Sequence, residues 1–189
     1  MNDGVLIGRM QFDYHLTPKP NHHLMITAGI LEDFFQGAGA EYLYFIPTKN
    51  YAFGIEAFKV KKRDYDWWFG TLDYENITAT ANFYYRNYGT IPFDMRASAG
   101  EYLAGDVGFT LELSRSFYNG VQFGAFASFT DVTTEQFGEG SFDKGIFFNI
   151  PIYGNLVNYV WRPLTKDPAA TLNRRHTLYG LLVRLKPIN

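Results

Sequence analysis

Residues 106–130 read DVGFTLELSRSFYNGVQFGAFASFT, and apolar side chains stand at every second position on both sides of a central turn. In the first half these positions hold Val107, Phe109, Leu111 and Leu113. Apolar residues at alternate positions are typical of a strand with one buried face. Asn119-Gly120 between the halves favours a tight hairpin turn, because both residues tolerate positive φ. The stretch therefore predicts two antiparallel strands joined by a short turn.

The same period of two recurs along the chain and predicts about twelve strands in a single domain, residues 1–189. The expected strands cover residues 5–16, 22–31, 38–46, 51–61, 74–86, 95–103, 106–117, 121–130, 144–152, 156–164, 169–174 and 176–186. An even number of antiparallel strands is typical of outer-membrane barrels. The fold prediction is an all-β, antiparallel up-and-down transmembrane β-barrel of about twelve strands.

The lengths of the connections give a second indication of a barrel. Outer-membrane barrels have short periplasmic turns and long external loops, so connection length alternates with strand number. Expected connections at 17–21, 47–50 and 118–120 are short, whereas those at 32–37, 62–73 and 132–143 are longer. Residues 87–94 and 104–105 do not follow the alternation. With an even strand count, both termini are expected on the periplasmic side.

The composition excludes several classes of protein. The net charge of −2 offers no basic excess for nucleic acid, and the absence of Cys excludes disulfides and thiolate chemistry. Mean hydropathy is −0.18, which suits barrel strands that alternate lipid-facing and lumen-facing residues. The first ten residues lack the pattern of a signal peptide. An exported form is therefore expected to have lost its signal or to be a fragment of a longer chain.

Charged residues and glycines fall on the strand faces opposite the apolar ones, as the filling of a narrow lumen requires. The expected interior charged and amide residues are Arg9, Gln11, Asp13, Glu41, Glu56, Glu75, Arg96 and Glu112. Aromatic residues near strand ends suggest interfacial girdles: Tyr14, Phe34, Phe35, Tyr44, Phe45, Tyr51, Trp67, Trp68, Tyr84, Tyr85, Tyr102 and Phe117. The alternative is a soluble, lipocalin-like barrel that binds a glycan or a lipid. In that alternative the Val107–Leu113 face would point inward.

Two segments are candidates for contact with a glycan or with the lumen. The segment FGEGSFDKG, residues 137–145, combines glycines, aromatic rings and charges, and aromatic rings can stack on sugar faces. A tight turn whose charges pair with interior groups explains it equally well. Trp67-Trp68 suits either a membrane-interface anchor or a sugar platform. The candidate residues are Trp67, Trp68, Phe137, Glu139, Phe142, Asp143 and Lys144.

The sequence contains no recognisable catalytic motif and no phosphate-binding glycine loop. His22 and His23 point to opposite faces of a strand, so they do not readily share a metal ion. We therefore expect no catalytic residue, no metal and no cofactor, and we expect that the protein is not an enzyme. An outer-membrane enzyme with a site at the barrel rim remains a further alternative, which Ser141 or an acidic residue beside His176 would favour.

Four motifs support a resemblance to a known family: GAGAEYLY at 37–44, GEYLAGD at 100–106, SRSFYNG at 114–120 and FGEGSFDKG at 137–145. RPLTKD at 162–167 follows in the right order. These segments resemble the C-terminal region of the YjbH-type exopolysaccharide biosynthesis proteins (YjbH/GfcD), from about Gly29 onward. Full members of that family are much longer than this chain. The resemblance implies no catalytic residues.

The resemblance implies a β-rich protein of the bacterial outer membrane that takes part in exopolysaccharide or capsule export. We expect a scaffold or accessory role, because a barrel this small is filled by its own side chains. The expected partners are outer-membrane lipid and, from the resemblance, polysaccharide, other proteins of an export complex or a separate chain that completes the family architecture. No nucleic-acid partner is expected.

Overall fold

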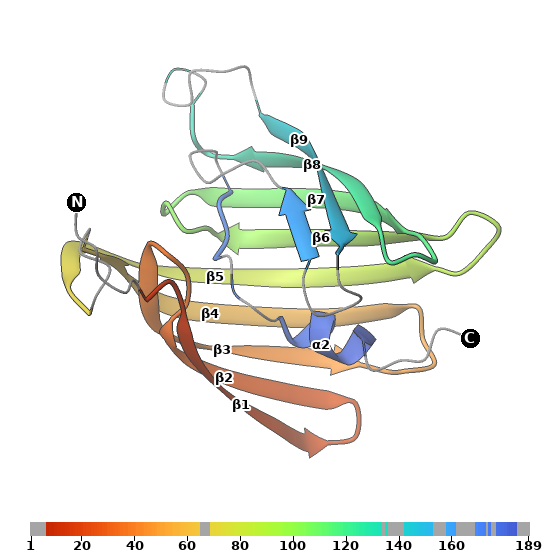
Figure 1. The fold of residues 1–189 in the computed structure, drawn as a ribbon, viewed down its shortest axis with the longest axis horizontal. Coiled ribbons are helices and arrows are strands. Elements are labelled where there is room, and N and C mark those ends of the chain that lie inside the picture. The colour runs from red at the N-terminus through yellow and green to blue at the C-terminus, as the bar shows by residue number, and fades with distance from the viewer. Residues whose placement is uncertain are drawn as a thin grey trace.

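The computed structural model forms one antiparallel sheet of ten strands, ordered β1 to β10 with sequence neighbours always paired (Figure 1). The residues that the structure describes are 7–64, 69–133, 135, 142–152, 158–161, 169–172, 174 and 177–184. The strands are β1 (Met10–Lys19), β2 (His22–Ile30), β3 (Phe35–Phe45), β4 (Tyr51–Arg63), β5 (Thr71–Asn87), β6 (Phe93–Glu101), β7 (Val107–Ser116), β8 (Gln122–Thr130), β9 (Asp143–Pro151) and β10 (Asn158–Trp161). A short helix, α2 (Leu178–Arg184), lies against one face of the sheet.

The first ten predicted strands are confirmed in order and direction. The hairpin at Asn119-Gly120 is confirmed as well: Gly120 has a φ of 81°, and the Phe117 amide donates to the Val121 carbonyl at 2.8 Å. The connection predicted at 87–94 shrinks to residues 88–92, because β5 and β6 extend further than the apolar pattern indicates. The all-β, antiparallel up-and-down prediction therefore holds at the level of the sheet.

The last two predicted strands are wrong. Residues 169–172 are not a strand, and residues 178–184 of the segment predicted as strand 176–186 form α2. A short apolar run such as LYGLLV suits a buried helix as well as a buried strand. Thr177 starts the helix, because its hydroxyl accepts the Gly180 amide at 3.1 Å in the manner of an N-cap. Among the described residues, β1 pairs only with β2 and β10 only with β9, so the sheet has two edges there.

The sheet curls toward α2, and we call the face that carries this helix the concave face (Figure 1). The opposite, outer face carries an apolar belt across most of the strands: Phe12, Ile26, Phe53, Ile55, Ile77, Val107, Phe109, Leu111, Leu113, Phe123, Phe129, Ile146 and Ile150. Phe12, Ile55 and Val107 are 67%, 59% and 52% exposed. The Val107–Leu113 face thus points outward, the reverse of what the soluble-barrel alternative requires.

Two expectations about faces are wrong. Glu75 lies on the outer face beyond the belt, where its carboxylate bridges Lys59 at 3.1 Å and Lys61 at 3.3 Å. Among the residues expected in the interfacial girdles, Phe45, Tyr84 and Tyr102 are buried on the concave face, and Phe35 packs against a buried cluster there. Aromatic content near a strand end does not reveal which face the ring takes, whereas the two-residue parity does.

The two ends of the strands differ in their connections. We call the end with the β1–β2, β3–β4, β5–β6 and β7–β8 connections the short-turn end, and the end with residues 64–70 and 131–142 the long-loop end. β1 starts at the long-loop end, whereas the described chain ends with α2 at the short-turn end. The expectation that both ends of the chain lie on the same side is therefore wrong for the described residues. None of the helices among the described residues is long and apolar enough to cross a membrane.

Gly39 of β3 tests the packing of the concave face. A Cβ there would lie 2.3 Å from the Ala57 carbonyl oxygen and 2.4 Å from the Phe58 ring, whereas neighbouring Ala40 points to the outer face. We expect Gly39→Val to lower the free energy of unfolding by about 1–3 kcal/mol through overpacking. Ala40→Val is the matched control and should change it little. Urea titration of the purified protein measures both, and equal effects of the two variants would contradict this register.

Candidate functional site

The concave face carries buried polar and charged side chains from neighbouring strands. Glu41 of β3 and Glu56 of β4 are in direct register, and Thr80 of β5 follows Glu56 in the next strand. Arg96 of β6 donates from Nε and Nη2 to the Asn82 side-chain carbonyl at 3.1 and 2.9 Å. Buried polar groups of this kind need partners, because each unpaired one costs about 1–3 kcal/mol.

The C-terminal part of the chain supplies partners to this face. We call its described residues, 169–172, 174 and 177–184, the C-terminal strap. The strap begins at the long-loop end, where the Ala169 amide donates to the Asp106 carboxylate at 2.6 Å and the Leu103 amide donates to the Ala170 carbonyl at 2.9 Å. Leu172 then packs on the buried cluster of Leu31, Phe58, Val60 and Leu103. The β6–β7 turn and the strap are thus joined by backbone contacts.

Arg174 lies at the middle of the strap and pairs with both glutamates. Its Nη1 donates to Glu41 Oε2 at 3.0 Å, and its Nη2 donates to Glu56 Oε2. The guanidinium also lies 4.3 Å from the centre of the Phe58 ring, a cation–π contact. The Arg174 and Glu41 side chains are only 3% and 4% exposed. This is a buried, branched ion pair between the strap and two strands.

The remaining carboxylate oxygens of the two glutamates also accept hydrogen bonds. Thr80 donates its hydroxyl to Glu56 Oε1 at 3.0 Å, and the Leu178 amide donates to Glu41 Oε1 at 2.9 Å. The Leu178 bond links the ion pair to the first residue of α2. Buried ion pairs are tolerated only when the remaining polar atoms are satisfied in this way.

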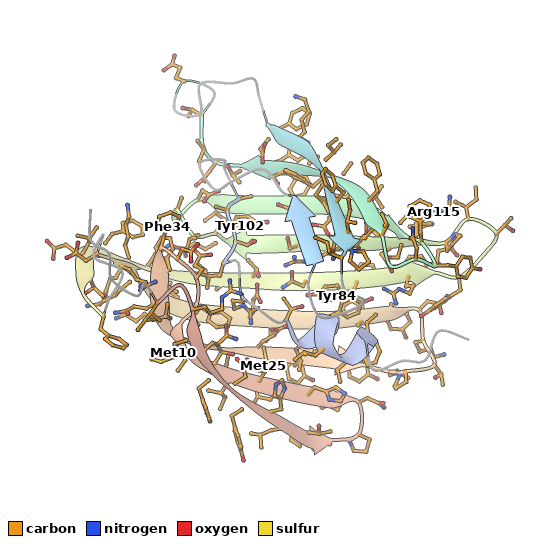
Figure 2. All side chains as sticks on the ribbon, viewed as in Figure 1. Met10, Met25, Phe34, Tyr84, Tyr102 and Arg115 are labelled. Atoms are coloured by element: carbon orange, nitrogen blue, oxygen red, sulfur yellow. The ribbon has the colours of Figure 1, made fainter. Side chains whose placement is uncertain are left out.

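Helix α2 ends the described strap at the short-turn end. Leu178 is buried against Met25, Leu43, Phe45, Ala52 and Tyr84. Tyr179 stacks on Tyr84 with ring centres 3.9 Å apart, and Figure 2 shows Tyr84 next to α2. Burial raises the pKa of Tyr179 to about 12, so its phenol stays neutral at physiological pH. The pocket beside α2 holds about 10 Å³, room for about one water molecule.

The structure separates the residues predicted to contact a glycan or the lumen. Phe142 and Lys144 lie on the outer face, where Lys144 Nζ is 4.5 Å from the centre of the Phe142 ring and Phe142 stacks on Phe129 at 4.6 Å. Asp143 is buried on the concave face, in register with Ser128. Trp67, Trp68, Phe137 and Glu139 lie outside the described residues, as do Ser141 and His176 of the enzyme alternative. Phe142 and Lys144 therefore take part in an aromatic contact on the outer face, whereas Asp143 faces the opposite side of the sheet.

Sequence reasoning missed Arg174, which it placed in a strand. A signal was present: Glu41 and Glu56 point to the same face of adjacent strands, and two carboxylates side by side require a cation. Gly105 in the β6–β7 turn has a φ of 83°, and the carboxylate of Asp106 after it accepts the Ala169 amide of the strap. Within the described residues, no group of three or more His, Cys, Asp or Glu could hold a metal ion.

Comparison with known proteins identifies the family. The model of a family described as "Exopolysaccharide biosynthesis protein YbjH" matches residues 1–184. The chain belongs to this YjbH family. It is 34% identical over 194 residues to the "Uncharacterized lipoprotein YjbH" of Escherichia coli K12, covering 96% of this chain and 27% of that protein. No solved structure matches the chain. This YjbH-family chain therefore spans about a quarter of the length of that relative.

Arg174 tests the contribution of the strap. Arg174→Met removes the cation and leaves Glu41 and Glu56 buried together, so we expect the free energy of unfolding to fall by about 3–5 kcal/mol. The triple variant Arg174→Met, Glu41→Gln and Glu56→Gln should recover part of this loss, because both buried carboxylates are removed with the cation while Arg96 keeps Glu112. Arg115→Met on the exposed β7 is the control. Chemical denaturation measures all three, and an Arg174→Met variant as stable as the control would contradict the role of the ion pair.

Proposed function

We propose that this chain is an outer-membrane β-barrel component of exopolysaccharide or capsule export, with a structural, accessory role rather than a catalytic one. The observation that carries the proposal is the apolar belt, which covers the outer face while charged and hydroxyl groups occupy the concave face. In water, so large an exposed apolar surface promotes aggregation. In a bilayer the same surface is solvated by acyl chains, and the polar side is enclosed.

The belt on the longest strand is about long enough to cross a membrane. Outward positions stay apolar from residue 77 to residue 85 on β5, and from residue 107 to residue 113 on β7. A tilted transmembrane strand needs about 9–11 residues, which the β5 stretch reaches and the β7 stretch approaches. The apolar band of an outer-membrane barrel is flanked by aromatic residues. Here Phe109, Phe129 and Phe142 stack at the long-loop end, while Tyr51, Phe53 and Phe83 make ring contacts toward the short-turn end.

The strap supports an accessory role. It follows the concave face from the β6–β7 turn to α2 and occupies the space beside β3, β4 and β5 that a passing polymer would need. The family description supplies exopolysaccharide biosynthesis as the pathway, and the printed name of the Escherichia coli relative, a lipoprotein, suits a cell-envelope location. The expected partners are outer-membrane lipid, other export proteins and the exported polysaccharide.

A charge at the middle of the belt tests insertion into a bilayer. Leu111 is 39% exposed, so Leu111→Arg would cost little in a water-soluble protein. In a bilayer we expect a loss of about 2–4 kcal/mol in folding free energy, because arginine is then held near the midplane. Tyr118→Arg, in the exposed β7–β8 turn beyond the belt, should cost at most about 1 kcal/mol. Folding titrations in phospholipid vesicles, read by heat-modifiable gel migration, compare the two, and equal small costs would exclude the membrane orientation.

Export without conduction tests the accessory role. Deleting the gene in a polysaccharide-producing host should lower the surface polysaccharide, and the intact gene should restore it. Liposomes containing the purified, heat-modifiable protein should swell in isotonic arabinose no faster than protein-free liposomes, because the strap occupies the concave face. A general porin is the positive control. Unchanged surface polysaccharide would contradict the role in export, whereas rapid swelling would contradict the accessory role and favour a conduit.

A further inference from the structure

A groove of about 450 Å³ opens on the outer face over β1 to β4, near the long-loop end. Its walls are mainly apolar and include Met10, Ile30, Ala38 and Phe69. Ala38 is exposed and in register with Lys59, which places the groove on the same face as the belt. The Gln36 amide donates to the Phe69 carbonyl at 3.3 Å and so ties the β4–β5 loop to this edge of the groove.

The lining of this groove carries a positive charge. Lys59 and Lys61 contribute two ammonium groups, and no carboxylate belongs to the lining. Both lysines contact the single carboxylate of Glu75, so the three side chains together keep one net positive charge. The lysine side chains are 61% and 53% exposed. Each ammonium has three donors, so both can also bind a second anionic oxygen.

The lysines stand at the boundary of the apolar belt. On β4 the outward positions run from Tyr51 through Phe53 and Ile55 to Ala57, and Lys59 is the next outward residue. In a membrane this is the level at which acyl chains give way to head groups. Lys59 is in register with Ala38, and Lys61 with Gln36, which pairs with Ile30, so the two ammonium groups lie beside the apolar wall of the groove at this boundary. Such a groove matches the part of a lipid where the start of an acyl chain meets a phosphate.

We propose that this groove binds an anionic, phosphate-bearing membrane lipid, with its acyl chain along Met10, Ile30 and Ala38 and its phosphate on Lys59 and Lys61. The inference rests on the proposed function, because it requires the outer face to lie in a bilayer. It adds a specific lipid site at the long-loop rim, where lysine charge distinguishes one head group from another.

The test uses the full chain in vesicles of mixed phosphatidylcholine and phosphatidylglycerol. The protein is extracted with a neutral detergent, and native mass spectrometry counts the retained lipids of each kind. We expect preferential retention of phosphatidylglycerol. Lys59→Gln with Lys61→Gln should reduce the preference by on the order of tenfold, because each lysine near the surface contributes about 1 kcal/mol. Lys59→Arg with Lys61→Arg should keep it.

Two further variants distinguish the effect of the lysine charge from the effect of the free volume in the groove. Ala38→Trp fills the groove from the outer face and should lower retention while both lysines remain. Lys19→Gln with Lys49→Gln removes the same charge at the short-turn end and should leave the preference intact. The proposed lipid site would be contradicted if the original protein retained both lipids equally. It would also be contradicted if the preference for phosphatidylglycerol were unchanged in the variant with glutamine at Lys59 and Lys61. Heat-modifiable migration of the same samples is read in parallel. If the protein shows heat-modifiable migration but no lipid preference, the result contradicts the lipid site alone. If the protein fails to insert into the vesicles, the result contradicts the proposed function as well.

Discussion

The ion pair between Arg174 and the two glutamates is the contact on which the concave face depends. The sheet turns its apolar residues outward, so Glu41 and Glu56 face inward on adjacent strands without water to solvate them. Two carboxylates in that position repel each other and lose hydration, and the Arg174 guanidinium offsets part of both costs through two direct ion pairs. Arg174 does so because the strap is tied down on both sides of it, at Ala169 by Asp106 and at Leu178 by Glu41. Because the sheet turns Glu41 and Glu56 inward, the strap has to lie where Arg174 can reach both carboxylates.

Because the strap fills the concave face, the surfaces left for interactions are the outer face, the two ends of the strands and the edges of the sheet. The strap satisfies the glutamates of β3 and β4 and covers the apolar cluster around Leu43 and Tyr84, which leaves little space beside α2. The Escherichia coli relative is about four times as long as the matched region. In the barrel that we propose, a filled concave face would leave the outer surface and the rims for the attachment of further parts of an export system.

The strands could be predicted from the sequence because their signal is local. The alternation from Val107 to Leu113 and the Asn119-Gly120 turn each need only neighbouring residues, and β1 to β10 follow from such patterns. The strap could not be predicted in the same way, because Arg174 meets Glu41 and Glu56 across more than one hundred residues of chain.

Glu75 shows a different limit of prediction from the sequence. Its odd position already places it on the outer face with Ile77, but its charge suggested the interior. Beyond the belt a charged side chain can face outward. There, the odd or even position of a residue in its strand predicts its face better than its charge does.

The apolar outer face also places a requirement on the two edges of the sheet. Unpaired backbone amides and carbonyls are costly in hydrocarbon, so the membrane orientation that we propose requires the edges left at β1 and β10 among the described residues to be covered or paired. Strand direction permits closure: β1 runs from the long-loop end to the short-turn end, and β10 runs back the other way. Ten antiparallel strands can therefore pair edge to edge without a change of direction, and any additional strands between β1 and β10 must come in pairs. Because α2 takes the residues of the last predicted strand, a twelve-strand closure needs strands other than 178–184. Closure through β1 and β10 themselves requires no additional strand and keeps the even number that this class of barrel favours.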